Sequence, residues 1–122
     1  MTTKTLLIVD DSTTSRLLIK AMFAEIQPEW NYLQAAGGDE ALNILQSTPV
    51  DYFSIDYNMP GLSGLELIEE VRKTHPQSPI VLLTANIQPQ IEEKSKLFNS
   101  LCIHKPLTDD TIKQAEEHFS HE

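Results

Sequence analysis

The chain has 122 residues, 40% of them hydrophobic, which predicts one globular domain over residues 1–122 and excludes a disordered chain. Its formal net charge of −9 would repel nucleic-acid phosphates, so we expect no DNA or RNA partner, although solubility alone would also explain the acidity. The single cysteine excludes an internal disulfide framework. The sequence shows no secretory signal, and no apolar run approaches the ~20 residues of a membrane span. We therefore expect a cytoplasmic protein with no membrane partner.

The first predicted elements are a strand, a helix and a second strand. Residues 5–10, TLLIVD, form a continuous apolar run, which is typical of a buried strand in a parallel sheet. A helix follows and ends at Pro28. Its predicted inner face consists of apolar residues at four-residue spacing and one neighbour: Leu18, Ala21, Met22 and Ile26. Residues 31–36 predict a weaker strand.

The middle of the chain predicts a turn, a helix, a strand and a loop. Gly37 and Gly38 indicate the turn, after which Asp39 is expected to cap a helix. The inner face of this helix is predicted to contain Ala41, Leu42 and Leu45. Residues 50–56 form the next strand, and the proline and glycines of residues 57–64 indicate a loop.

The last part of the chain predicts three helices separated by two strands. The helices cover residues 65–75, residues 87–99 and a final segment near the C-terminus, and the strands cover residues 79–85 and 100–104. The apolar residues assigned to the inner faces of the three helices are, in chain order, Leu65, Ile68 and Val71; Ile87, Ile91 and Phe98; Ile112, Ala115 and Phe119. The sequence therefore alternates strand and helix five times. This alternation predicts an α/β fold with a parallel sheet, right-handed crossovers and helices on both faces.

Charged and polar side chains follow the predicted strands. Asp10 and Asp11 end the first strand, Asp56 ends the third, Thr84 ends the fourth and Lys105 follows the fifth. Ligands of open α/β sheets bind outside the carboxyl ends of the strands, so these side chains are expected to meet. Crowded carboxylates raise one another's pKa, and a Mg²⁺ ion with its preference for oxygen ligands would relieve that repulsion.

Each of these residues has a simpler explanation when it is taken alone. Asp10 and Asp11 would be explained as a helix cap, Asp56 as a turn residue and Lys105 as a surface cation. Thr84 alone is a weak signal. Their placement at four strand ends in one chain favours a metal and phosphoryl site over these separate explanations.

Five stretches of the chain match one known family in order and spacing. They are LLIVDDS (6–12), GGDEAL (37–42), DYNMPGLSG (56–64), PIVLLTA (79–85) and HKPL (104–107). With them the chain resembles the CheY-like receiver domain of two-component response regulators. This resemblance implies a flavodoxin-like (βα)5 doubly wound fold with a five-stranded parallel sheet in the order 2-1-3-4-5.

The resemblance also implies a Mg²⁺ site and an acceptor. Asp56 would accept a phosphoryl group from the phosphohistidine of a histidine kinase. Asp11 and Asp56 would bind Mg²⁺ directly, and Asp10 would bind it mainly through water. Asn58 would contribute its backbone carbonyl to the metal.

Two further residues receive roles from the same resemblance. Thr84 would move toward the phosphoryl group, and Lys105 would pair with phosphoryl oxygens after a cis peptide bond to Pro106. In the family an aromatic residue commonly stands three positions before the lysine, whereas this chain has Cys102 there. Cys102 is too small to act as the usual aromatic switch, a role that Phe98 could take instead, and we expect Cys102 to be a small buried apolar residue rather than a redox group.

The function implied is phosphorelay signalling rather than enzymatic turnover of a separate substrate. A sensor histidine kinase or phosphotransfer protein would donate the phosphoryl group. A downstream effector would bind the face made by the fourth helix, fifth strand and fifth helix, and a phosphorylation-dependent homodimer is also compatible with the family. One alternative is a phosphorylation-independent interaction module. The other is an aspartyl-phosphate phosphatase, which would need a second aspartate where this chain has Asn58.

Overall fold

Strands and helices alternate along the chain in the computed structural model, which describes residues 3–85 and 88–120. The strands are β1 (Thr5–Val9), β2 (Asn31–Ala35), β3 (Tyr52–Asp56), β4 (Ile80–Thr84) and β5 (Leu101–His104). The helices are α1 (Thr13–Ile26), α2 (Gly38–Ser47), α3 (Gly64–Thr74), α4 (Pro89–Leu97) and α5 (Asp109–Ser120). All paired strands run parallel in the order β2-β1-β3-β4-β5, which confirms the flavodoxin-like fold expected from the sequence.

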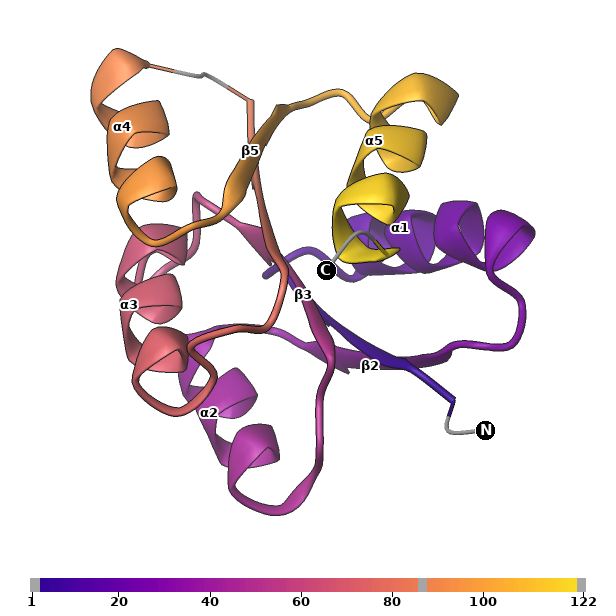
Figure 1. Cartoon of the computed structure of the whole chain (residues 1–122), viewed down its shortest axis with the longest axis horizontal. Coiled ribbons are helices and arrows are strands. Elements are labelled where there is room, and N and C mark those ends of the chain that lie inside the picture. The colour runs from indigo at the N-terminus through magenta and orange to yellow at the C-terminus, as the bar shows by residue number, and fades with distance from the viewer. Residues whose placement is uncertain (1–2, 86–87, 121–122) are drawn as a thin grey trace.

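The helices form a layer on each side of the sheet. In Figure 1, α2, α3 and α4 lie on one face, and α1 and α5 lie on the other. Side chains that alternate along β1 show how one strand serves both layers: Leu7 packs on the first side, and Leu6 and Ile8 pack on the second. Strands that are covered on both faces are expected to be apolar throughout, as β1 is.

The core under α1 and α5 is rich in aromatic rings. Trp30, which comes just before β2, has its ring centre 4.9 Å from that of Tyr52 and 6.3 Å from that of Phe119. Tyr52 and Phe119 are stacked with their ring centres 5.1 Å apart. Phe23 of α1 lies 5.8 Å from Phe119. These contacts fix α5 against α1 and against the amino ends of the strands.

The buried face of α1 differs from the prediction. Ile19 and Phe23 are the buried residues of this helix, whereas Leu18 is 55% exposed and Ile26 is 46% exposed. Met22 is only partly buried. The two sets of residues form adjacent stripes on the helix, one residue apart, and both have the four-residue spacing. The periodicity therefore predicted the helix correctly, but the predicted inner face was wrong. Ala21, which belonged to that face, is exposed as well.

Asp39 does not occupy the N-cap of α2 as predicted, whereas α3 begins with a complete capping box. Gly37 stands at the N-cap of α2, and Asp39 lies in the first turn, where a carboxylate still interacts favourably with the helix dipole. At α3, the Ser63 side chain accepts a hydrogen bond from the Glu66 N–H, and the Glu66 carboxylate accepts one from the Ser63 N–H. This capping box fixes where the chain leaves the loop after β3.

The shortest helix, α4, is anchored at its C-terminal end. It begins at Pro89, so Ile87 of the predicted inner face lies outside the described residues; Ile91 is buried and Leu97 is 81% exposed. The Arg72 guanidinium of α3 donates to the backbone carbonyl oxygens of four residues around the two adjoining loops, which are His75, Ser78, Phe98 and Asn99. In the described part of the chain, no helix has the length and apolar content needed to cross a bilayer.

Candidate functional site

Three carboxylates meet at the carboxyl edge of the sheet. Asp10 and Asp11 follow β1, and Asp56 is the last residue of the neighbouring strand β3. One ligand oxygen from each lies within 4.8 Å of the others. Asp10 is 2% exposed and Asp56 is 6% exposed, while Asp11 is open to solvent. The predicted convergence of these residues on one edge is therefore what the structure shows.

Lys105 supplies the positive charge of the cluster. Its Nζ lies 2.9 Å from Asp56 Oδ1 and 3.4 Å from Asp10 Oδ2. The backbone N–H of Lys105 donates to the Thr84 carbonyl oxygen at 2.8 Å, which fixes the lysine beside the end of β4. The Lys105–Pro106 peptide bond is cis, as the resemblance implied.

The charges of the cluster change the pKa of its central carboxyl. Burial raises the pKa of Asp56 above its usual value of 3.8, and the negative charges of Asp10 and Asp11 raise it further, while Lys105 lowers it. For Lys105, burial lowers the pKa, but the hydrogen bond and the charge of Asp56 outweigh that effect, and the pKa is raised. A carboxylate this crowded is stabilised by additional positive charge.

A side chain that the sequence did not indicate holds the Asp10 backbone. The Arg16 guanidinium of α1 donates to the Asp10 carbonyl oxygen at 2.6 Å and to Gln34 Oε1 at 3.1 Å. The Ser12 N–H donates to Asp10 Oδ1 at 2.9 Å. Together these bonds connect β1, α1 and β2 around the acidic pair. A lone arginine inside a helix carries no sequence signal for this contact, because Gln34 lies on another strand.

The loop after β3 is held close under Asp56. The Tyr57 N–H donates to the Leu83 carbonyl at 2.8 Å, and the Gly64 N–H donates to the Tyr57 carbonyl at 3.0 Å. A Cβ atom on Gly64 would lie only 2.5 Å from the Asp56 carbonyl oxygen, so the start of α3 touches the backbone of Asp56 itself. Asn58 lies in this loop with an exposed side chain.

Thr84 and two residues of β5 complete the surroundings. Thr84 is 1% exposed and pairs in register with His104 of β5, and the neighbouring Leu83 pairs with Asp56. Cys102 is half-buried and packs against the core on the side of α2, α3 and α4. His104 is exposed and its Nε2 lies 2.7 Å from the Ala85 carbonyl oxygen.

The donor set of the cluster fits a hard divalent cation. Carboxylate oxygens are the ligands that Mg²⁺ prefers, and Mg²⁺ binds to proteins through a few carboxylates while it keeps water or phosphate oxygens. Within the described ranges, 3–85 and 88–120, Asp10, Asp11 and Asp56 are the only group of three His, Cys, Asp or Glu side chains close enough to share an ion. Burial, and to a smaller extent the charges of Asp10 and Asp11, raise the pKa of Asp56, and a bound cation would favour its charged form.

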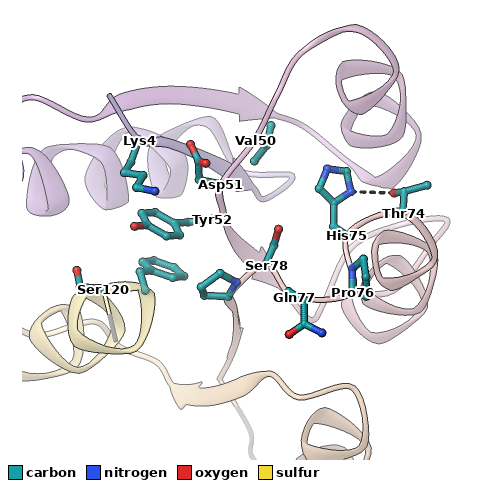
Figure 2. Close-up of a pocket in the computed structure, with 12 residues that line it drawn as sticks. Lys4, Val50, Asp51, Tyr52, Thr74, His75, Pro76, Gln77, Ser78 and Ser120 are labelled. Carbon is teal, nitrogen blue, oxygen red and sulfur yellow. Dashed lines mark hydrogen bonds between the residues drawn. The ribbon is translucent and has the colours of Figure 1, made fainter. Parts of the chain in front are cut away.

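A second hollow lies at the opposite edge of the sheet (Figure 2). This cavity of about 560 Å³ is formed by residues before β1, β3 and β4 and by the ends of α3 and α5. Asp51 in its wall accepts a hydrogen bond from the Thr5 N–H at 2.8 Å, and His75 Nδ1 lies 2.8 Å from the Thr74 hydroxyl. Among the described residues, the group of side chains able to share a metal ion lies at the carboxyl edge and not around this cavity, so we place the candidate site at the carboxyl edge.

The raised pKa of Asp56 predicts a pH-dependent effect of Asp56→Asn on stability. The folded protein binds the Asp56 proton more tightly than the unfolded chain does, so this contribution destabilises the fold as the pH rises through the pKa of the folded state. Without Mg²⁺, the variant is expected to be more stable than wild type at neutral pH, because it removes a carboxylate whose charged form the folded protein disfavours. The difference should shrink as the pH falls toward about 4.

Urea unfolding in EDTA at several pH values would measure this difference. The exposed Asp109→Asn serves as a control, because it changes the same formal charge away from the cluster. An Asp56→Asn protein that is less stable than wild type at neutral pH would contradict the prediction.

Comparisons with known proteins agree with the fold and the site. A family model described as "Response regulator receiver domain" matches residues 6–117. The chemotaxis protein CheY of Pseudomonas aeruginosa is 32% identical over 115 residues, which are 92% of this chain and 92% of that protein. Among solved structures, the chemotaxis protein CheY4 of Vibrio cholerae has a TM-score of 0.87 at 26% identity and covers 97% of this chain and 99% of its own.

Other similar proteins are larger or were solved with bound ligands. The sensor protein EvgS of Escherichia coli K12 is 36% identical over 109 residues, which are 88% of this chain but 9% of EvgS. The chain likewise spans 11% of the sensor histidine kinase RcsC of the same strain. The response regulator TrrA of Thermotoga maritima, solved in complex with Mg²⁺-BeF, has a TM-score of 0.80 at 32% identity over 95% of this chain and 98% of its own.

Proposed function

This chain belongs to the response regulator receiver domain family of two-component systems, and from that membership we propose that it accepts a phosphoryl group on Asp56 with the help of Mg²⁺. The observation that carries the proposal is the buried Asp56 carboxylate, 2.9 Å from Lys105 Nζ and within 4.8 Å of oxygens from Asp10 and Asp11. On this proposal, the nucleophile, a cation and the metal ligands all lie at one point.

Four residues would hold the metal. Asp11 and Asp56 would bind Mg²⁺ directly, Asp10 would bind it mainly through water, and Asn58 would offer its backbone carbonyl. When bound, Mg²⁺ supplies positive charge where negative charge accumulates on the transferred group. The structure of TrrA in complex with Mg²⁺-BeF supports this assignment, because TrrA is 32% identical to this chain.

The protein's own residues would carry out the transfer. An Asp56 carboxylate oxygen attacks the phosphorus of a phosphohistidine in a histidine kinase or phosphotransfer protein. A P–O bond to Asp56 forms while the P–N bond breaks, and the leaving imidazole takes a proton from solvent. Lys105 neutralises a phosphoryl oxygen and the Thr84 hydroxyl donates a hydrogen bond to another, so both act by positioning and charge. On this proposal the chain is a signalling protein and not an enzyme with a separate substrate.

The phosphoryl group would change the protein's affinity for other proteins. We assign the effector surface to α4, β5 and α5, where the exposed Leu97 offers an apolar contact. Phosphorylation would shift the equilibrium between two arrangements of this face. A homodimer through it is a second form of the same output. This activity would take place in the cytoplasm, where histidine kinases present their phosphohistidine.

Intact-mass measurement tests the acceptor and the metal together. Wild type and Asp56→Asn are incubated with acetyl phosphate, with Mg²⁺ and with EDTA, and sampled at short times. The expected result is one added phosphoryl group on wild type in Mg²⁺ alone. The conservative Asp56→Asn keeps the shape of the side chain while it removes the nucleophilic carboxylate.

The other outcomes point to specific alternatives. An adduct on Asp56→Asn would move the acceptor to another residue. A folded wild type that forms no adduct and binds no beryllofluoride would favour a phosphorylation-independent interaction module, with Cys102 in the usual aromatic position as its distinguishing feature.

A further inference from the structure

His104 joins the end of β5 to the connection that follows β4. Its ring nitrogen Nε2 lies 2.7 Å from the backbone carbonyl oxygen of Ala85, a good distance for an N–H···O hydrogen bond. Because a carbonyl oxygen only accepts, the ring must donate, which requires the proton on Nε2. His104 is exposed, so this bond is made at the surface by a side chain that the core does not hold.

The bond lies at the point where Thr84 would have to move. Thr84 and His104 are register partners, and the Lys105 N–H donates to the Thr84 carbonyl at 2.8 Å, which extends the pairing of the two strands to the end of β4. The ring of His104 then reaches one residue further, to Ala85. It thus continues the β4–β5 pairing past the end of the sheet. Since Ala85 follows Thr84 directly, holding its carbonyl restricts the backbone of Thr84.

The contact between His104 and Ala85 gains weight because β5 carries the small Cys102 and no aromatic ring at that position. Side chains two residues apart on a strand point to the same face, so Cys102 and His104 both face the side of α4. Cys102 is small, half-buried and packed against the core. It has no ring that could exchange between two positions next to Thr84. On this face of β5, His104 is a side chain that bonds to Ala85, the described residue that follows β4.

We propose that His104 is a positioning residue whose bond to the Ala85 carbonyl holds Thr84 and Ala85 in the arrangement of the unphosphorylated protein. This inference rests on the proposed function, in which Thr84 moves toward a phosphoryl group on Asp56. That movement draws Ala85 away from His104 and breaks the bond. The bond is present in one arrangement only, so it opposes conversion to the other.

The size of the effect follows from the strength of one exposed hydrogen bond. A net intramolecular hydrogen bond changes an equilibrium by roughly twofold to tenfold. His104→Ala removes the bond and should increase the affinity for the phosphoryl mimic beryllofluoride by that factor. His104→Gln places an amide N–H donor near the position of Nε2 and should retain the affinity of wild type.

Isothermal titration calorimetry with beryllofluoride in Mg²⁺ tests the inference on the three proteins. Support requires His104→Ala to bind roughly twofold to tenfold more tightly than wild type while His104→Gln does not. An unchanged or weaker affinity of His104→Ala overturns the inference and leaves the proposed function intact. A wild type that binds no beryllofluoride overturns both, since the bond would then have no phosphorylated arrangement to oppose.

A second measurement tests the bond without any ligand. Long-range ¹H–¹⁵N spectra of the neutral imidazole distinguish the two ring tautomers. The inference requires the Nε2–H tautomer of His104 in the free protein and a changed Nε2 shift when beryllofluoride is bound. A dominant Nδ1–H tautomer would overturn it, whatever the calorimetry gives.

Discussion

Lys105→Met is expected to slow phosphorylation by acetyl phosphate by about 10²- to 10³-fold, which is the usual effect of removing one preorganised group that stabilises transition-state charge. The Lys105 ammonium lies 2.9 Å from Asp56 and 3.4 Å from Asp10. In the described chain, it is the only lysine or arginine nitrogen within salt-bridge distance of these carboxylates. Methionine keeps most of the side-chain length and removes this charge. On the proposed function, the transferred phosphoryl group would lose the positive charge that neutralises its oxygens.

The replacement of Lys105 should also change the pKa of Asp56 in the free protein. Lys105 lowers the pKa of Asp56 against the effect of burial, so its removal should raise that pKa further. Less of the nucleophilic carboxylate would then be ionised at acidic pH, and the rate of the variant should fall more steeply than that of wild type as the pH is lowered.

Time-resolved intact mass at saturating Mg²⁺ measures the rate. Lys113→Met is the matched control, because Lys113 is exposed on α5 and its replacement changes the formal charge by the same amount. The control should phosphorylate like wild type. Equal rates for Lys105→Met and Lys113→Met would contradict the assignment of Lys105 to the transferred phosphoryl group.

Gly64→Ala is expected to destabilise the protein by about 2–3 kcal/mol, the range of severe overpacking. A Cβ at this position would lie 2.5 Å from the Asp56 carbonyl oxygen and 2.8 Å from both Leu82 Cδ1 and the Tyr57 Cα. Leu82 could change rotamer, but two of the three atoms belong to the backbone. The start of α3 or the end of β3 would therefore have to move, and the Asp56 carboxylate would move with it.

Gly37→Ala provides the matched control for this change. A Cβ on Gly37 would meet no atom within 4 Å, and its φ of −176° is extended backbone that alanine also adopts. Urea unfolding should give a loss of at most about 1 kcal/mol for Gly37→Ala, because alanine is less favourable than glycine at the N-cap but meets no clash there. Similar stabilities for the two variants would show that the loop after β3 can move at little free-energy cost. That result would contradict the prediction for Gly64→Ala.

The sequence predicted the order of elements because the strands are continuous apolar runs that end at turn residues. It predicted the position of the acidic cluster for the same reason: the carboxyl ends of parallel strands share one edge. The strand order required the resemblance, since composition and periodicity do not say which strands are neighbours.

Other features depend on contacts that the sequence does not encode locally. In α1, Leu18 and Ile19 belong to neighbouring apolar stripes, and the packing against the sheet and α5 decides which one is buried. Arg16 reaches Gln34 on another strand, and His104 reaches a carbonyl that precedes α4. Such long-range bonds from single polar residues leave no periodic pattern. Gly64 was visible as part of the family motif, but the contact that requires a glycine there appears only in three dimensions.

The aromatic cluster around Trp30 has a practical consequence for optical experiments. Trp30 is the only tryptophan of the chain, and it precedes β2, at the end of the sheet opposite Asp56. A five-residue strand separates the two ends by roughly 17 Å. Its fluorescence is therefore expected to report unfolding of the α1–α5 side and to stay nearly constant when Mg²⁺ or beryllofluoride binds. Unfolding curves recorded by tryptophan fluorescence would then need no correction for the state of the acidic cluster.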